Sequence, residues 1–403
     1  MRYWRYKPSQ TSDRQQQVQQ GPRQHRTAAE GTAAGRAGST VMSTDQAKQE
    51  HGIKAVNQEY TQYDQVEKEQ TYNLAEGAAE EEFDEETQIR TCDMSLFHHG
   101  GPEGRAQFAR DIGEAMEGIG FVILENHEIP PGLYEEAERK VAEFFTATPM
   151  ADKMKYEAER HGSVNQGYFP IKQTSRMHPD LVEGWVFCRR AFNLGENPDY
   201  RETDYWPAAG YEPFFRQVIQ HHEKLILPLM QSILTYLGCD PSLYDEKLTR
   251  TNFGFRLNYY PPITKEDDES GAGRMLGHED VDLFTILPSH GVDGLQVLNR
   301  ENMKWIRLNP PEGSIIINTG DYMQRITNDR LPSTTHRVSK PQDASLFGSA
   351  RVSIPMAVYV WEEEMLEVLP NTGAPKYEPI SAVQFHTRTT SKYYGDDYAV
   401  DDD

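Results

Sequence analysis

Cysteine is scarce in this chain of 403 residues, which has only Cys92, Cys188 and Cys239. An odd number of cysteines without a Cys-x-x-Cys pair excludes a disulfide framework and a cysteine-rich zinc site. This usage is typical of a reducing compartment, so we expect a cytoplasmic protein. No apolar run approaches the roughly 18 residues of a membrane span, and the first ten residues lack the apolar core of a signal peptide.

Basic residues are fewer than acidic residues. The chain has 41 Lys and Arg and 63 Asp and Glu, which gives a net charge of −22. A surface this negative repels phosphates, so we expect no general binding to nucleic acid or to anionic membranes. The charge favours a protein that acts on small molecules, and it leaves the oligomeric state open.

Apolar residues make up 37 % of the chain, which is low for a fully folded protein. The deficit is concentrated in residues 1–88, which are rich in Gln and Arg, then in small residues, then in acidic residues. Such a segment cannot offset the entropy cost of ordering, so we expect a disordered N-terminal extension. Met42 within it is an alternative candidate for the first residue. The acidic end, 396–403, is expected to be a frayed tail.

Residues 89–245 are expected to form a mainly helical domain. Apolar residues recur at helical spacing in several segments, with one short strand at 121–124. The predicted helices are 105–117, 133–145, 150–156 and 211–237. Pro228 should kink the last of these or divide it in two. His221 and His222 on that helix are expected at the surface.

From residue 253 onward, short strand-like runs alternate with Gly, Pro, Asn and Asp. The predicted strands are 253–260, 283–287, 295–298, 305–308, 314–318, 335–339 and 351–360. Seven short strands at this spacing indicate an antiparallel sandwich or barrel at 246–370, followed by a C-terminal extension at 371–403. The fold class expected from helices followed by strands is α+β.

The segment Gly277-His278-Glu279-Asp280 is the first candidate for chemistry. Residues two apart on a strand face the same way, so His278 and Asp280 could present an imidazole and a carboxylate to one point. His336, at the start of a later predicted strand, could supply a third ligand. Two His and one carboxylate leave open positions on a metal, as in Fe(II) oxygenases, whereas a structural zinc site is closed by four ligands.

Arg351 and Ser353 form a second candidate pair, because they share one face of a predicted strand. The planar guanidinium of Arg matches a carboxylate, and an Arg in an apolar core is costly without an anionic partner. A local Asp or Glu is the alternative partner. Asp282, two positions beyond Asp280, is a rival carboxylate ligand, and Glu279 should point away from the metal or into the substrate mouth.

Several segments in order carry a family resemblance. They are 258–262 (Asn-Tyr-Tyr-Pro-Pro), 278–280, 285–287, 294–297, 318–321 (Asn-Thr-Gly-Asp), 333–338 (Ser-Thr-Thr-His-Arg-Val) and 351–353. This set resembles the catalytic domain of the isopenicillin N synthase-like 2-oxoglutarate/Fe(II) dioxygenases. The segments 120–127, 144–153 and 167–168 are similar to that family's helical domain. The resemblance spans residues 91–370.

The resemblance implies a double-stranded β-helix (jelly-roll) core with an N-terminal helical domain and flanking helices. It implies iron ligation by His278, Asp280 and His336. It implies that Arg351, Ser353 and Tyr260 bind the distal carboxylate of 2-oxoglutarate. It also implies that Asn258 orients the proximal end.

The implied activity is oxidation of a small-molecule C–H bond by O₂ and 2-oxoglutarate, with hydroxylation as the default outcome and succinate and CO₂ as products. Two alternatives remain at this point. One is an isopenicillin N synthase-type oxidase, in which the Arg-x-Ser pair binds substrate and 2-oxoglutarate is not used. The other is a catalytically silent barrel. Trp185, Phe187 and Trp206 are expected either to border the substrate or to pack in the core. The substrate itself is not evident.

Overall fold

The computed structural model describes residues 62–63, 66–67, 82–171, 180–270, 272–289 and 294–394. Most of the predicted extension, and the predicted acidic tail at 396–403, therefore lie outside the described residues. Within residues 1–81 the described elements are β1 (Gln62–Tyr63) and β2 (Val66–Glu67), which pair antiparallel. Among the helices in the described part of the chain, none has the length and apolar character needed to cross a membrane.

The four helices predicted in the first half are present, with small shifts at their ends, as α3 (Gly101–Ile119), α4 (Leu133–Ala147), α5 (Met150–Lys153) and α6 (Tyr211–Tyr236). A 3-10 turn at Met154–Tyr156 completes the third of them, and two short helices that were not predicted, α2 (Ser95–His99) and α7 (Asp245–Thr249), flank the set. In α3 the apolar face buries Phe108, Ile112 and Met116, and the helix packs against α6. The helical spacing of apolar residues thus marks the face that enters the core.

The sequence predicts that Pro228 kinks the long helix or divides it in two, and the division does not occur. Helix α6 runs without interruption through Pro228, and the hydroxyl of Ser232 donates a hydrogen bond of 2.7 Å to the Pro228 carbonyl. Leu225 and Leu229, on either side of the proline, are buried in the same core. Burial of a continuous apolar face therefore outweighs the loss of one backbone hydrogen bond.

The expectation that His222 lies at the surface is also wrong. Its side chain is fully buried, and its Nε2 lies 3.1 Å from the Tyr134 hydroxyl on α4. Burial lowers the pKa of His222 to about 3, so its imidazole is neutral. His221, its neighbour, is partly exposed.

The largest sheet in the described residues contains strands from both halves of the chain. Its order is β3 (Thr91–Asp93), β4 (Phe121–Glu125), β13 (Ile315–Thr319), β10 (Phe284–Pro288), β16 (Met356–Tyr359), β8 (Asn252–Tyr260), β7 (Glu183–Cys188), β6 (Val164–Phe169) and β5 (Glu159–His161). Strand β15 (Arg351–Ser353) also pairs with β8. Only the β3–β4 pair within this path is parallel. The boundary expected at residue 245 therefore falls between strands of one sheet that share one core.

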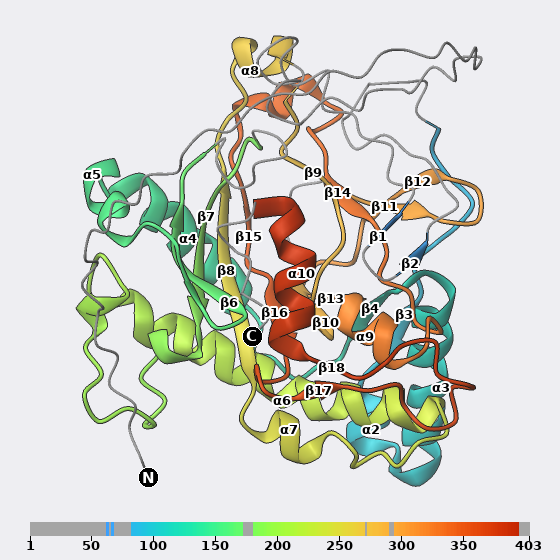
Figure 1. Cartoon of the computed structure of the whole chain (residues 1–403). Helices are drawn as coiled ribbons and strands as arrows, with labels where there is room; N and C mark the ends of the chain where they lie inside the picture. Colours follow the sequence, from blue (N-terminus) through green and yellow to red (C-terminus); the bar gives the residue numbers. More distant parts are fainter. Residues whose placement is uncertain are drawn as a thin grey trace, which may run out of the picture. The chain divides into compact units, whose positions relative to one another are not determined.

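The second sheet has the order β12 (Lys304–Arg307), β11 (Leu295–Asn299), β14 (His336–Val338) and β9 (Met275–His278). Together the two sheets form the predicted jelly-roll core within an α+β fold (Figure 1). Strand β9 was not among the seven listed strands, although a strand was assumed at 278–280. The predicted strand at 351–360 is two strands, β15 and β16, separated by Ile354 and Pro355. Proline has no N–H to continue the ladder.

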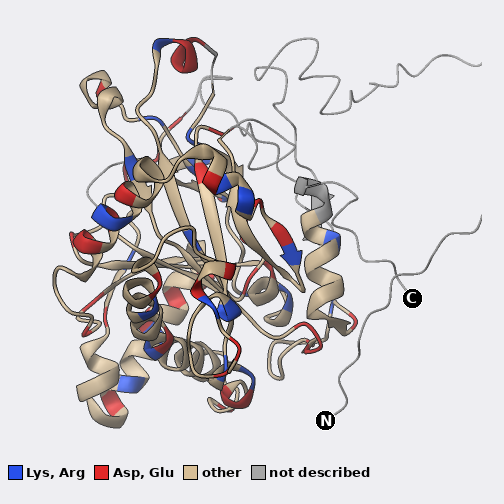
Figure 2. Ribbon diagram, turned by 90° about the vertical axis from the view of Figure 1, so that its left-hand side faces the viewer, with Lys and Arg blue, Asp and Glu red and all other residues tan. Residues whose placement is uncertain are grey.

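Helices and short strands complete the described chain. They are α8 (Lys265–Ser270), α9 (Asp321–Ile326), β17 (Met365–Leu366), β18 (Ile380–Ser381) and α10 (Ala382–Tyr394). Helix α10 supplies His386 and Thr390 to the cavity described below. Lys, Arg, Asp and Glu lie mainly on helices and loops, and most strand residues are uncharged (Figure 2). Charged surface thus surrounds a largely uncharged sheet interior.

Residues 82–87, expected within the disordered extension, contact the smaller sheet. Phe83 forms a bridge with Trp305, and the Arg307 guanidinium carbon lies 3.4 Å from the centre of the Phe83 ring. Asp84 accepts hydrogen bonds of 2.8 Å from the side-chain amides of Asn299 and Asn302. These polar partners, which are distant in sequence, hold a segment that has few apolar residues of its own.

The three aromatic residues Trp185, Phe187 and Trp206 belong to the core and are not among the residues that line the cavity. Phe187 stacks on Trp206 with ring centroids 3.8 Å apart, and both side chains are buried. On β7, Gly184 and Val186 alternate with Trp185 and Phe187 and therefore face the opposite side of the sheet. They lie beside Arg256 and Asn258 of β8. Strand alternation therefore assigns Trp185 and Phe187 to packing, and Trp206 packs with them through its stack on Phe187.

Candidate active site

His278 and His336 come together because their strands pair. The two residues are register partners in the antiparallel β9–β14 ladder, and their ring centroids lie 4.3 Å apart. The Nδ1 of His278 lies 2.9 Å from the Leu276 carbonyl, and the Nδ1 of His336 lies 3.1 Å from the Thr334 carbonyl. Each carbonyl can accept the Nδ1 proton, which leaves both Nε2 lone pairs available for a metal.

Asp280 supplies the carboxylate of this cluster. Its Oδ1 lies 3.8 Å from the Nε2 of His278 and 3.8 Å from the Nε2 of His336. Its other oxygen, Oδ2, accepts hydrogen bonds from Thr285 Oγ1 at 2.7 Å and Asn318 Nδ2 at 2.8 Å. One oxygen is thus held by the larger sheet while the other faces both imidazoles. Asp280 lies beyond the end of β9, so a turn, and not the expected strand alternation, brings it beside His278.

The protonation states suit metal binding. Burial lowers the pKa of His278 to about 4, and the neighbouring His336 contributes to the same shift, so the imidazole is neutral. Burial alone would raise the pKa of Asp280, but the two imidazoles and the hydrogen bonds from Asn318 and Thr285 together lower it. A neutral imidazole and a charged carboxylate are the forms that bind a metal.

The rival carboxylate, Asp282, lies outside the cluster. Its side chain is fully buried, and its Oδ2 lies 2.7 Å from Thr285 Oγ1. Burial and the adjacent charge of Asp280 raise the pKa of Asp282 well above its ordinary value. Glu279 turns away as well, since its Oε1 accepts a hydrogen bond of 2.9 Å from Thr335. The metal-type cluster in the described residues consists of His278, Asp280 and His336.

A second group of predicted residues lies across the cavity, on β8 and β15. Arg351 is the register partner of Tyr260, and Ser353 is the register partner of Asn258. The Arg351 guanidinium carbon lies 5.0 Å from the centre of the Tyr260 ring, and Asn258 Nδ2 donates to Ser353 Oγ at 3.2 Å. Arg351 is only 8 % exposed, so its charge lies in a largely dry wall.

All seven predicted residues line one cavity of about 250 Å³ between the two sheets. Three further residues of this cavity had no role assigned from the sequence. Thr285 and Asn318 donate hydrogen bonds to Asp280, and Arg256 lies on the same face of β8 as Asn258 and Tyr260. The motif segments contain Thr285 and Asn318, so their presence was visible, but their contact with Asp280 was not.

The donor set fits iron and not a closed structural site. Two imidazole nitrogens and one carboxylate oxygen, all within 4.8 Å of one another, match the facial triad of non-haem Fe(II) oxygenases. Three further positions would remain for exogenous ligands. The polar wall of Arg351, Ser353, Tyr260 and Asn258 faces the same cavity and offers a cation and hydroxyls suited to a dicarboxylate.

Comparisons with known families agree with this geometry. Residues 251–359 match the 2OG-Fe(II) oxygenase superfamily, and residues 89–209 match the N-terminal domain described as non-haem dioxygenase in morphine synthesis. A 2-oxoglutarate-Fe(II) type oxidoreductase, ppzC, from Metarhizium rileyi is 30 % identical over 336 residues, 75 % of this chain and 86 % of the relative. This chain therefore belongs to the 2-oxoglutarate/Fe(II)-dependent dioxygenases, and it uses Fe(II), 2-oxoglutarate and O₂ to oxidise small molecules.

Solved structures of similar proteins show the same fold. A full-length protein from Neurospora crassa, in complex with alpha-KG and thymine, is 25 % identical, with a TM-score of 0.68 over 77 % of this chain and 99 % of that one. A putative 2OG-Fe(II) oxygenase family protein from Caulobacter crescentus is 28 % identical, with a TM-score of 0.63 over 76 % and 99 %. These likenesses span both halves of the described chain.

Proposed function

We propose that His278, Asp280 and His336 bind Fe(II), and that 2-oxoglutarate binds between this iron and Arg351. The observation that carries the proposal is the convergence of two Nε2 atoms and Asp280 Oδ1 at one end of a cavity whose opposite wall presents a buried guanidinium. The iron, when bound, supplies O₂ activation coupled to decarboxylation of 2-oxoglutarate.

The chain's own residues act by binding and orientation. Arg351 pairs with the distal carboxylate of 2-oxoglutarate through its planar fork, and Ser353 and Tyr260 supply hydroxyls beside it. Asn258, held by its hydrogen bond to Ser353, orients the proximal end. The surrounding jelly roll excludes water, so that oxidation is directed to the substrate.

The proposed outcome is hydroxylation of a C–H bond in a small molecule. One oxygen atom of O₂ enters the substrate as C–OH, the other enters succinate, and 2-oxoglutarate loses CO₂, so atoms and electrons balance. The names of the relatives as 2-oxoglutarate-Fe(II) oxidoreductases favour this over an oxidase that takes all four electrons from its substrate. The three buried free cysteines agree with a reducing cytoplasmic compartment.

The test is an anaerobic titration of the Fe(II)-loaded protein with 2-oxoglutarate. The visible metal-to-ligand charge-transfer band is measured at each step. We expect a saturable band in the wild-type protein and none in His336→Ala. Arg351→Ala should need about 100-fold more 2-oxoglutarate, because a charge-assisted pair is lost. Arg250→Gln removes an arginine outside the cavity and should behave as wild type.

Two other outcomes would contradict parts of the proposal. Iron binding without a band on addition of 2-oxoglutarate would favour the oxidase alternative. No iron binding at all would show that the three ligands are wrongly assigned and that the chain is a silent barrel. A band that survives His336→Ala would show that a different residue supplies the third ligand.

A further inference from the structure

Alternate residues of β8 line the active-site cavity and continue past the cosubstrate residues. Gly254, Arg256, Asn258 and Tyr260 face the cavity, whereas Phe253, Phe255 and Leu257 are buried in the core. Residues two apart on a strand are separated by about 7 Å. Arg256 therefore lies one step beyond Asn258 along the same wall, on the side away from Tyr260, whose register partner is Arg351.

The charge of Arg256 has no counter-ion among the residues that the structure describes. Within that part of the chain no carboxylate pairs with its guanidinium, and its Nε is buried without a hydrogen-bond partner. The guanidinium carbon lies 5.7 Å from the ring centre of Phe169. The backbone N–H of Arg256 is engaged elsewhere, in a hydrogen bond of 2.8 Å to the Pro355 carbonyl.

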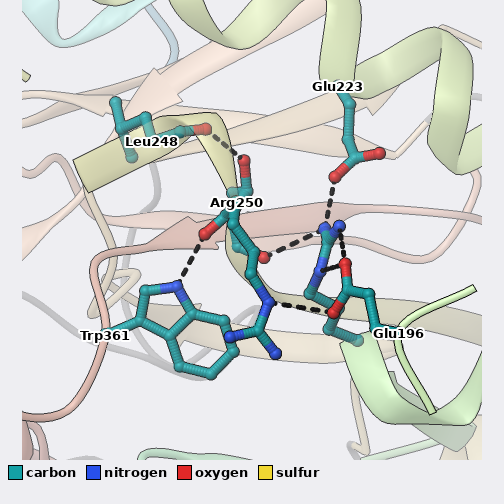
Figure 3. Close-up of polar contacts among 7 residues, drawn as sticks. Glu196, Glu223, Leu248, Arg250 and Trp361 are labelled. Atoms are coloured by element: carbon teal, nitrogen blue, oxygen red, sulfur yellow. Dashed lines mark hydrogen bonds and ion pairs between the residues drawn. The ribbon is translucent and has the colours of Figure 1, made fainter. Parts of the chain in front are cut away.

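Arginines near β8 but outside the cavity are paired in the ordinary way. Arg250 donates through Nε to Glu196 at 2.9 Å, and its guanidinium also lies over Trp361 (Figure 3). Arg189 contacts both Glu196, at 2.6 Å, and Glu223, at 2.5 Å. In the described chain, Arg189 and Arg250 therefore each pair with a carboxylate, whereas Arg256 does not.

Arg256 is partly buried, and one side of it is apolar. Val164, Phe169 and Val186 form a buried cluster beside it, and Val186 is its register partner on β7. At residue 184 a glycine leaves room for the side chain, since a Cβ there would lie 3.1 Å from Arg256 Nη2 and 3.2 Å from its Nε. A guanidinium in such a wall is costly unless an anion arrives to neutralise it.

We propose that Arg256 binds a carboxylate of the substrate, so that this enzyme oxidises a carboxylic acid distinct from 2-oxoglutarate. The inference rests on the proposed function, because it assigns Arg351 to the cosubstrate and leaves Arg256 for the substrate. The planar fork of Arg pairs with a carboxylate through two hydrogen bonds, and Phe169 provides an apolar face for the adjoining carbons. Arg256 is thus a substrate-positioning and specificity-determining residue.

Matched pairs of acids and amides test this assignment, because each pair differs only in charge and shape at the carboxyl group. The probes are phenylacetate, cinnamate and hexanoate, each beside its primary carboxamide. Binding to the anaerobic protein loaded with Fe(II) and 2-oxoglutarate is measured by isothermal titration calorimetry. The wild-type protein should bind at least one acid about tenfold or more tightly than its amide, since one charge-assisted pair is at stake.

Three variants complete the experiment. Arg256→Gln should reduce the preference for the acid to within about twofold, and Arg256→Lys, which keeps the charge without the fork, should retain part of it. Arg250→Gln, which removes a paired guanidinium outside the cavity, should keep the full preference. The charge-transfer band with 2-oxoglutarate, recorded on every sample, shows that each variant is folded and loaded.

The outcomes separate this inference from the proposed function. If no acid binds the wild-type protein more tightly than its amide, or if Arg256→Gln keeps the preference, the assignment of Arg256 is wrong although the band still forms. If the wild-type protein shows no band, the proposed function fails first. Loss of the band in Arg256→Gln alone would place Arg256 at the cosubstrate and also overturn the inference.

Discussion

His278 and His336 face one another across the β9–β14 ladder, with ring centroids 4.3 Å apart, although they are far apart in the sequence. The spacing between the two imidazoles is therefore set by backbone pairing and not by a flexible loop. Backbone carbonyls beside each Nδ1 hold the rings so that both Nε2 atoms point to Asp280. Three groups held in this way are arranged to bind a metal without a rearrangement of the backbone.

The two neighbouring aspartates should differ sharply on replacement. Asp280→Asn removes the carboxylate that faces both imidazoles, so we expect iron binding and activity to fall below detection. Asp282→Asn replaces a buried carboxyl that lies outside the cluster and has a raised pKa, and an amide can still form the hydrogen bond with Thr285. We expect this variant to bind iron within about threefold of wild type, measured by iron titration. Equal loss in both variants would show that Asp282 takes part in the metal site.

Asn318 should matter through Asp280 and not by touching iron. It donates to Asp280 Oδ2 at 2.8 Å and is buried. Removal of a partner that orients a metal ligand lowers metal affinity by about 10- to 100-fold, so Asn318→Ala should show that loss in competition with a chelator. Asn299→Ala, a change at a buried Asn on the smaller sheet that contacts Asp84, is the matched control. Unchanged affinity in Asn318→Ala would mean that Thr285 alone suffices.

Two glycines at the end of α3 should respond in opposite ways to alanine. Gly120 has a φ of +73°, and a Cβ there would lie 2.4 Å from the Pro332 carbonyl oxygen. Gly120→Ala should lower the free energy of unfolding by at least about 2 kcal/mol, through backbone strain and this clash. Gly118 lies within the helix with open space around it, so Gly118→Ala should leave stability unchanged or raise it by up to about 1 kcal/mol. Urea unfolding of both variants measures the difference.

Buried His222 should make stability depend on pH. Its pKa is lowered to about 3 in the folded protein, so below about pH 6.5 the unfolded chain takes up a proton that the folded chain does not. Stability present above pH 6.5 is therefore lost as the pH falls toward 3. Between pH 7.5 and 5.5 the loss from this residue should be about 1 kcal/mol.

Urea unfolding at the two pH values checks this. The pH-dependent loss should be about 1 kcal/mol smaller in His222→Gln than in wild type. Tyr134→Phe removes the hydrogen-bond partner but leaves His222 buried, so it should keep the wild-type dependence. If Tyr134→Phe abolishes the dependence, the hydrogen bond and not burial controls the imidazole.

The sequence alone was sufficient for the family, the fold class and the seven candidate residues, because each of these depends on short local patterns. Strand alternation relates Arg351 to Ser353, and helical spacing marks the face of α3 that enters the core. The motifs also contain Thr285 and Asn318. These signals are local and can be read without knowing which segments pair.

Tertiary structure decided what depends on contacts between distant segments. The pairing of β9 with β14 sets the distance between the two imidazoles, and one sheet joins strands from both halves of the chain. Packing on both sides of Pro228 keeps α6 continuous, and burial makes His222 a neutral core residue. The absence of a carboxylate beside Arg256 in the described chain is likewise a property of the folded wall. Residue order specifies which groups are available, but burial and charge neutralisation depend on which neighbours the fold brings to them.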